Sequence, residues 1–148
     1  IVEKYIGDAV MASFAAFDDL EHPAANAYCA AQAIIAQVAE WQAEDPANGG
    51  APLEIGVGLN FGPAVVGDIG QREAVTPAVI GATVNLAARL EKATRELGSD
   101  AVLSEQFANR LHSEVPVAAP TLLARYGQTQ TIQVKGFSEP VRVFFNNC

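Results

Sequence analysis

Asn85 and Arg89 are the residues whose types and spacing most directly suggest chemistry, because they stand four positions apart in a segment with helical periodicity. Side chains at that spacing share one helix face, with their bases about 6 Å apart. A guanidinium and an amide near a helix start could bind an anion together, since the helix dipole also favours negative charge there. Taken alone, the same pattern favours a solvated polar face opposite a leucine stripe.

Asp8 is the second candidate, because it follows Gly7 between two short runs of alternating apolar residues. That arrangement is typical of a β-hairpin turn, where an aspartate often satisfies local backbone amides. A carboxylate at a hairpin tip could also hold a hard cation, since magnesium prefers oxygen ligands. One carboxylate makes a weak metal site without a second.

Two lysines extend this set. Lys4 lies on an apolar strand face between Val2 and Ile6, where its ammonium group needs a partner. A structural role and a binding role are equally supported for Lys4. Lys135 precedes Gly136 in a tight turn and, as a bare observation, is an exposed loop lysine.

Other kinds of site are not indicated. The glycines between residues 56 and 70 match neither the dinucleotide fingerprint nor the P-loop spacing. His22 and His112 have no cysteine or serine at a telling spacing, so we expect no catalytic triad and place both at the surface. Cys29 and Cys148 are too far apart in sequence to indicate a disulfide framework or a zinc site, and a cytoplasmic setting fits best.

Composition indicates one soluble globular domain of 148 residues, with 50% hydrophobic and 18% charged residues. A net charge of -8 argues against a nucleic acid surface, which needs a basic stripe. The uncharged stretch 23–39 is mainly alanine with polar residues, so we expect no membrane contact. The sequence opens at Ile1 and its only methionine is Met11, so we interpret it as part of a longer reading frame.

Alternating apolar residues predict three β-hairpins that could carry these side chains. The first spans residues 2–14, the second spans 53–70 with a turn at 60–63, and the third spans 132–145. Glycines placed regularly inside the second hairpin indicate a closely approached backbone. A short strand is also predicted at 101–103.

Helical periodicity predicts three helices between these strands. The first runs from Pro23 to a stop before Asn48. The second has Thr83 as its cap and ends at Gly98, and the third runs from Ser104 to about His112. The core-facing stripes are Tyr28, Ala31, Ile35 and Val38 in the first helix, and Leu86, Leu90, Ala93 and Leu97 in the second. A linker with Pro116 and Pro120 precedes the last hairpin. The predicted class is α+β, a mixed sheet with helices on one face.

Four motifs occur in an order and spacing that resemble the catalytic domain of class III adenylyl and guanylyl cyclases. They are KYIGDAVMASF, IGVGLNFGPAVVGDIG, VIGATVNLAARLE and VKGFSEPVRVF, and the match runs from Glu3 to Phe145. The resemblance implies a single catalytic domain over residues 1–148 with a ferredoxin-like βαββαβ sheet. It also implies that the family's first strand, which bears the first metal-binding aspartate, is missing because it would precede Ile1.

The resemblance assigns a role to each candidate. Asp8 is similar to the second metal-binding aspartate, Lys4 to the lysine that reads adenine, and Asn85 to the asparagine that positions the ribose. Arg89 is similar to the arginine that stabilises the pentavalent phosphorus, and Lys135 to a lysine that contacts the terminal phosphates. The implied reaction converts ATP to 3′,5′-cyclic AMP and pyrophosphate, with two Mg²⁺ or Mn²⁺ ions per active site.

Purine preference follows from hydrogen-bond polarity. Adenine has an acceptor at N1 and guanine has a donor there, so Lys4 favours ATP. In the family an Asp, Thr or Ser seven residues before the asparagine accepts from the exocyclic amine, and that position is Ala78 here. Only backbone groups of Ala78 and Val79 could complete adenine recognition. Ala78 therefore also supports two alternatives, a guanylate cyclase and a catalytically degenerate, cyclase-like regulatory domain; a plain α+β ligand-binding module is a third.

Family members pair head to tail, and each site takes its metal carboxylates from one chain and its purine, ribose and phosphate contacts from the other. The implied partners are therefore ATP and a second copy of this domain in a homodimer. Lys4 and Asp8, although neighbours, would serve different sites. We expect a chain that begins at Ile1 to turn over little or no ATP, because a lone carboxylate cannot hold both ions.

Overall fold

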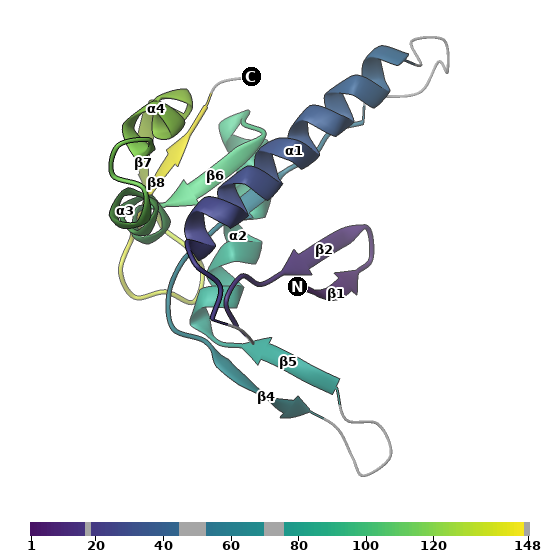
Figure 1. Cartoon of the computed structure of the whole chain (residues 1–148), viewed down its shortest axis with the longest axis vertical. Helices are drawn as coiled ribbons and strands as arrows, with labels where there is room; N and C mark the ends of the chain where they lie inside the picture. Colours follow the sequence, from purple (N-terminus) through teal and green to yellow (C-terminus); the bar gives the residue numbers. More distant parts are fainter. Residues whose placement is uncertain (17–18, 45–52, 70–75, 147–148) are drawn as a thin grey trace.

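The structure is a computed structural model that describes residues 1–16, 19–44, 53–69 and 76–146 (Figure 1). In chain order its elements are β1 (Val2–Ile6), β2 (Ala9–Ala12), α1 (Pro23–Glu44), β3 (Val57–Leu59), β4 (Val65–Ile69), β5 (Thr76–Ile80), α2 (Ala82–Leu97), β6 (Ala101–Ser104), α3 (Glu105–Glu114), α4 (Ala119–Leu123), the 3₁₀ helix η1 (Ala124–Tyr126), β7 (Gln128–Ile132) and β8 (Val141–Phe145). The predicted α+β class is confirmed.

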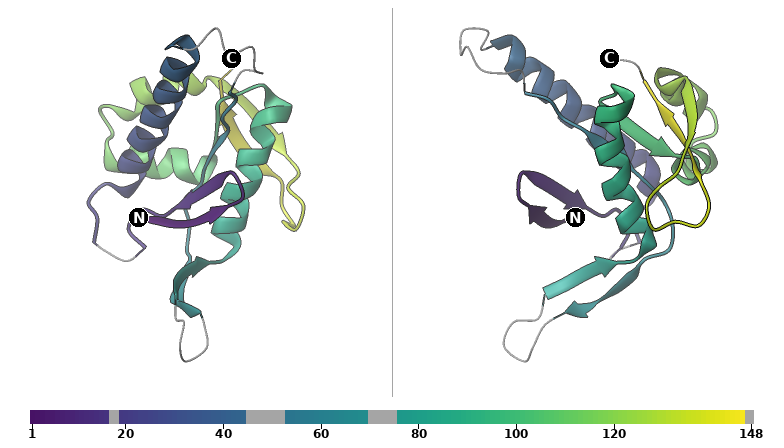
Figure 2. Two further views of the ribbon diagram at one scale, coloured as in Figure 1. Left: turned by 90° about the vertical axis from the view of Figure 1, so that its right-hand side faces the viewer. Right: turned by 180° about the vertical axis from the view of Figure 1, so that it is seen from behind.

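A four-stranded mixed sheet in the order β3-β6-β8-β7 forms the centre of the fold. β3 runs parallel to β6, and the other neighbours are antiparallel. All of β6 is buried, because its alternating side chains enter two different cores. Leu103 packs with Tyr28 of α1 and Phe107 of α3, whereas Val102 packs with Leu86 and Leu90 of α2. Helices therefore cover both faces of the sheet rather than the one face that we expected (Figure 2).

The prediction of a hairpin over residues 53–70 is wrong. β3 pairs with β6 in the central sheet, whereas β4 leaves the sheet and pairs antiparallel with β5. Alternating apolar residues identify strands but not their partners, and β5 was not anticipated as a strand at all. β4 and β5 form a two-stranded arm that projects from the body of the molecule (Figure 1).

The first helix is confirmed, since α1 begins at Pro23 and buries Tyr28, Ala31 and Val38. Its predicted end before Asn48 lies outside the described residues. No helix in the described part of the chain combines the length and the apolar content needed to cross a membrane.

The ends of the later helices were predicted in part. Gly98 ends α2 in the left-handed conformation, with φ 59°, and the Ser104 hydroxyl accepts from the Phe107 amide at 3.1 Å to cap α3. Thr83, however, does not cap α2, because the helix begins one residue earlier and Gly81 is its N-cap. The proline-containing linker holds α4 and η1, which were missed because each is a single short turn.

The first hairpin is confirmed, and the third is confirmed as a strand pair, although its first strand spans 128–132 and so ends where the prediction began. β7 pairs with β8 in the central sheet, and β1 pairs with β2 around Gly7, which has φ 65°. A register shift in the first hairpin pairs Lys4 with Met11 but Val2 with Ala12. Because Met11 and Ala12 point to opposite faces, Lys4 and Val2 do not share the face that the sequence suggested.

Glu114, at the end of α3, holds the start of α1. Its carboxylate accepts from the Ala25 amide at 2.9 Å, from the Ala24 amide at 3.2 Å and from Arg110 Nε at 2.6 Å, and its side chain is 4% exposed. Burial raises the pKa of the Glu114 carboxyl, but these hydrogen bonds outweigh it, so the pKa lies below its ordinary value of 4.5. The ionised form is therefore the one that the fold stabilises.

We expect Glu114→Gln to lower the free energy of unfolding by about 1 kcal/mol at pH 7. Because the folded-state pKa of Glu114 is depressed, its contribution is present above the unfolded-state pKa and is lost as pH falls through the folded-state value. The gap between the two proteins in urea unfolding should therefore close below about pH 4. Glu105→Gln, in the exposed ion pair with Arg142, is the matched control and should cost at most about 0.5 kcal/mol. A gap that stays constant from pH 7 to pH 3 would contradict this assignment.

Candidate nucleotide-binding site

The backbone of α2 lies directly on β3, which fixes the helix that carries Asn85 and Arg89. A Cβ atom on Gly58 would lie 2.2 Å from the carbonyl oxygen of Ala87 and 2.4 Å from the amide nitrogen of Glu91. Only a glycine allows this approach of helix to strand. The position of Asn85 and Arg89 relative to the sheet is thus set by backbone contact.

Asn85 and Arg89 lie one above the other on α2, on a face next to that of the buried residues Leu86 and Leu90. Asn85 is exposed and Arg89 is half-buried. Within the described ranges, neither side chain has a hydrogen bond or an ion pair. Arg89 is half-buried as a residue, and its guanidinium has no acceptor among the described residues, so an anionic ligand could supply one.

The turn that contains Lys135 lies beside Arg89. The Phe137 amide donates to the Val134 carbonyl at 3.0 Å, and Gly136 has φ 86° in this turn. A Cβ atom on Gly136 would lie 3.8 Å from Nη2 of Arg89. Two cationic residues that are far apart in the sequence therefore come from adjacent segments of one surface, which is favourable for binding several phosphate groups.

Ala78 and Val79 lie on β5, the strand that leads through Gly81 into α2. Ala78 is opposite Gly67 on β4, and Val79 is buried with 6% exposure. Neither Ala78 nor Gly67 has a polar side chain, so polar contacts at this position fall to backbone groups.

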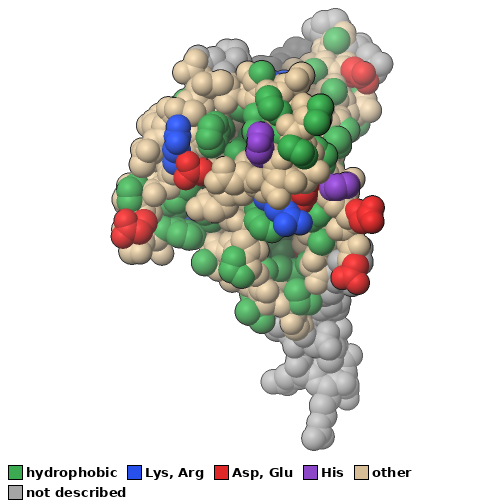
Figure 3. Space-filling view, turned by 60° about the vertical axis from the view of Figure 1, so that its left-hand side comes forward, with side chains coloured by type: hydrophobic (Ala, Val, Ile, Leu, Met, Phe, Trp, Pro, Cys, Tyr) green, Lys and Arg blue, Asp and Glu red, His purple; other side chains and the backbone are tan. Residues whose placement is uncertain are grey.

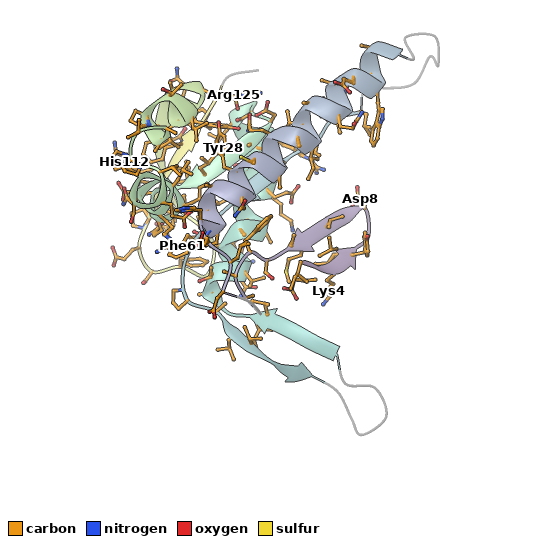
Figure 4. All side chains as sticks on the ribbon, viewed as in Figure 1. Lys4, Asp8, Tyr28, Phe61, His112 and Arg125 are labelled. Carbon is orange, nitrogen blue, oxygen red and sulfur yellow. The ribbon has the colours of Figure 1, made fainter. Side chains whose placement is uncertain are left out.

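Lys4 and Asp8 stand apart on the first hairpin, whose strands form a two-stranded sheet of their own. Both residues are exposed, and neither has a hydrogen bond or an ion pair to the rest of the described chain. Figure 4 shows Asp8 at the turn and Lys4 extending from β1 on the side of the hairpin away from α1. The structure thus brings Arg89 and the Lys135 turn together but records no contact between Asp8 and either of them.

A metal site is only partly provided by this chain. The Asp8 carboxylate is an oxygen ligand of the type that magnesium and manganese prefer. No group of three or more His, Cys, Asp or Glu residues in the described ranges could hold a metal ion. In ligand type, Asp8 therefore fits such a metal, and the described residues near it do not complete a site.

Three polar residues, Asn60, Thr83 and Ser104, connect the loop after β3 with the first turn of α2. From the sequence we had interpreted Asn60 as a turn residue and the other two as helix caps. Asn60 Nδ2 donates to the carbonyl oxygen of Thr83 at 2.9 Å, and Asn60 Oδ1 accepts from the Ser104 hydroxyl at 2.6 Å. The Thr83 hydroxyl donates to the Pro63 carbonyl at 2.5 Å. No local signal indicated this role, because Thr83 and Ser104 lie 23 and 44 positions away from Asn60 in the sequence.

Among the described residues, the face shown in Figure 3 carries acidic and basic side chains and no basic stripe. Both His22 and His112 are exposed, as predicted. The net charge of -8 remains the argument against a nucleic acid surface.

Comparison with known proteins places this arrangement in a family. The sequence profile of the adenylate and guanylate cyclase catalytic domain matches residues 2–146. The chain therefore belongs to this family, and the resemblance inferred from its four motifs is confirmed.

Curated relatives match almost all of this chain. An adenylate cyclase of Anabaena cylindrica is 29% identical over 97% of the chain, and an uncharacterized protein of Mycobacterium tuberculosis is 31% identical over 97%. The chain spans only 27% and 23% of the lengths of these two relatives. The similarity is thus to one part of longer proteins.

Solved structures show the same fold. The guanylyl cyclase Cya2 superposes with a TM-score of 0.75 at 26% identity, covering 98% of this chain and 68% of that one. The adenylyl cyclase CyaB from P. aeruginosa superposes with a TM-score of 0.64 at 25% identity, covering 97% and 69%. Both adenylyl and guanylyl cyclases are therefore among the structural relatives.

Proposed function

We propose that this chain is the catalytic domain of an adenylate cyclase, which converts ATP to 3′,5′-cyclic AMP and pyrophosphate at a site shared by two copies. The observation that carries the proposal is the guanidinium of the half-buried residue Arg89, which has no acceptor in the described chain and lies beside the turn of Lys135. That surface suits a polyphosphate, and membership of the cyclase family supplies the class of reaction.

In the proposed reaction the ribose 3′-oxygen of ATP bonds to the α-phosphorus while the bond from that phosphorus to the β-bridging oxygen breaks. Pyrophosphate leaves, and the proton of the 3′-hydroxyl passes to solvent. Asn85 orients the ribose, Arg89 donates hydrogen bonds to the phosphoryl oxygens as charge builds on them, and Lys135 binds the departing phosphates. Catalysis then comes from positioning and preorganised charge. Asp8 supplies one ligand for the two Mg²⁺ or Mn²⁺ ions, which when bound activate the hydroxyl and neutralise phosphate charge.

The second copy of the chain is proposed because Asp8 has no contact with Arg89 or Lys135 in its own chain. In a head-to-tail pair, the first hairpin of one copy would bring Asp8 to the α2 face of the other. The hairpin and the β4–β5 arm expose apolar side chains that such a pair would cover. These include Tyr5 at 75%, Val10 at 58% and Val65 at 62% exposure.

Lys4 is proposed to select ATP by donating to adenine N1. Lys4→Glu replaces this donor by an acceptor, which suits the N1–H of guanine. We expect the ratio of ATP to GTP turnover to fall about tenfold or more, as for the loss of a charged hydrogen bond. Lys92→Glu changes charge at an exposed site on α2 and should leave the ratio unchanged. An unchanged ratio in Lys4→Glu would remove Lys4 from purine recognition.

The function itself is tested by expressing the protein from its complete reading frame and supplying ATP or GTP with Mg²⁺ or Mn²⁺. Cyclic AMP and pyrophosphate formed in equal amounts is the expected result. Ala78 is the observation that favours a second candidate, because it leaves no side-chain acceptor for the adenine amine. Cyclic GMP alone would identify a guanylate cyclase, and nucleotide binding without turnover would identify a regulatory domain.

A further inference from the structure

We propose that Asn60 is a positioning residue, which fixes the first turn of α2 and so sets where Asn85 and Arg89 stand. The inference rests on the proposed function, because it assigns Asn60 a purpose through those two residues. The Asn60 side chain is not itself part of the proposed nucleotide site.

The edge of the central sheet holds Asn60 in place. β3 and β6 are parallel neighbours with Leu59 opposite Leu103, so Asn60 and Ser104 follow at the same edge. Ser104 is fully buried, and its hydroxyl donates to Asn60 Oδ1 at 2.6 Å. The carbonyl oxygen of Thr83 can only accept, so it fixes the amide nitrogen of Asn60 toward α2 and leaves the amide oxygen to accept from Ser104.

On the α2 side, Asn60 Nδ2 donates to the Thr83 carbonyl oxygen at 2.9 Å. Thr83 stands two positions before Asn85 and six before Arg89, so this bond holds the turn from which Asn85 projects. The N-cap residue of α2 is Gly81, which has no side chain to cap the helix. Asn60 therefore anchors a helix start that lacks a cap of its own.

A second bond makes the anchor rigid. The Thr83 hydroxyl donates to the Pro63 carbonyl at 2.5 Å, so the loop after β3 holds Thr83 at two points. A Cβ atom on Gly62 would lie 2.7 Å from Oγ1 of Thr83, which shows how closely the loop approaches the helix. Loss of the Asn60 bond would leave the helix start free to shift, and a displacement of about 1 Å can cost about 100-fold in rate.

The amide of Asn60 is suited to this role because it accepts from Ser104 and donates to Thr83 at once. Asn60→Asp keeps the shape and the acceptor but replaces the donor by an oxygen that faces the Thr83 carbonyl. In the complete protein we expect kcat for ATP to fall about 10- to 100-fold. KM should change less than about threefold, because Lys135 and the metal ligands are untouched.

Two further variants separate positioning from loss of folding. Asn60→Ala removes both hydrogen bonds without adding a charge, and it should lower kcat in the same way. It replaces Asn60→Asp as the test if that variant does not fold. Leu111→Ala truncates a fully buried residue in the core between α1 and α3, away from α2. It should lower the unfolding temperature at least as much as Asn60→Ala but leave kcat within about twofold at temperatures where both are folded.

Hydrogen exchange of the backbone amides in residues 83–87 gives a readout that does not need turnover. Faster exchange in the Asn60 variants, with no change there in Leu111→Ala, is expected. Unchanged kcat and unchanged exchange in both Asn60 variants would overturn the positioning role. If the unaltered protein makes no cyclic nucleotide, the proposed function fails. Hydrogen exchange still tests the positioning role in that case, because unchanged exchange in the Asn60 variants would show that Asn60 does not hold the start of α2.

Discussion

Replacing Arg89 by alanine should lower the rate of cyclic AMP formation by about a hundred- to a thousandfold, or about 3 to 4 kcal/mol of transition-state stabilisation. Arg89 is half-buried, lies beside the Lys135 turn and has no acceptor in the described chain, so its hydrogen bonds are available to the phosphoryl group. Because its charge matters most as the phosphorus becomes pentavalent, the loss should fall mainly on kcat. Steady-state kinetics with the complete protein measure this.

Arg95→Ala is the matched control for that change. Arg95 is an exposed arginine on the same helix, near its C-terminal end, so its removal tests the effect of losing an arginine from α2. It should leave kcat within about twofold, as for other surface substitutions. Arg89→Lys keeps the positive charge but loses the planar fork, and it should recover only part of the rate. Equal losses in Arg89→Ala and Arg95→Ala would remove Arg89 from the reaction.

Gly58→Ala should destabilise the domain by about 3 kcal/mol, more than any other single methyl group that we consider. The added Cβ would lie 2.2 Å from the Ala87 carbonyl oxygen and 2.4 Å from the Glu91 amide nitrogen. Both atoms belong to helix backbone, so no side-chain rotation can relieve the contact. α2 must move away from β3, which should also displace Arg89 and lower activity in whatever fraction remains folded.

Gly67→Ala is the control for Gly58→Ala, because a Cβ atom at Gly67 would meet nothing within 4 Å. It adds the same methyl group to a strand glycine on the exposed arm, and its unfolding free energy should lie within about 0.5 kcal/mol of the parent. Urea unfolding of the three proteins measures both values. A Gly58→Ala protein as stable as Gly67→Ala would show that the helix is not seated on the strand.

Features set by neighbouring residues could be predicted from the sequence. The Gly7–Asp8 turn, the start of α1 at Pro23, the Gly98 end of α2 and the Ser104 cap all depend on residues within one turn of each other. Local hydrogen bonding and backbone freedom decide such features, so the residue types at those positions are sufficient.

Features that depend on distant segments could not be predicted in the same way. The strands of residues 53–70 looked like a hairpin, but β3 found a parallel partner in β6 and β4 paired with β5. Gly58 was visible as a strand glycine and the helix of residues 83–98 was predicted, but the sequence did not show that this helix packs on that strand. Asn60 was read as a turn residue because its partners, Thr83 and Ser104, are far away in the sequence.

The candidate site was predictable only through the resemblance to cyclases. Residue patterns alone left Arg89 on a solvated helix face and Lys135 in an exposed loop, and nothing in their spacing indicated that the two segments meet. In the structure the two segments are neighbours, since a Cβ atom added to Gly136 would lie 3.8 Å from Nη2 of Arg89. The proposed roles of all these residues remain predictions, and the sharing of Asp8 between copies also needs a second copy of the chain.

The central claim is that Asp8 of one copy and Arg89 of the other serve the same active site. Asp8→Ala and Arg89→Ala should each abolish most activity when assayed alone. In a mixed dimer one site carries both substitutions and the other carries neither. Random mixing makes half of the dimers mixed, each with one intact site of two, so we predict recovery of about a quarter of the parent activity.

The measurement is cyclic AMP formation by the two variants co-expressed from complete reading frames with different affinity tags. Purification through both tags in turn yields the mixed dimer alone, whose predicted activity is about half that of the parent dimer. Mixed dimers that form and yet show no more activity than either variant alone would contradict a site shared between copies.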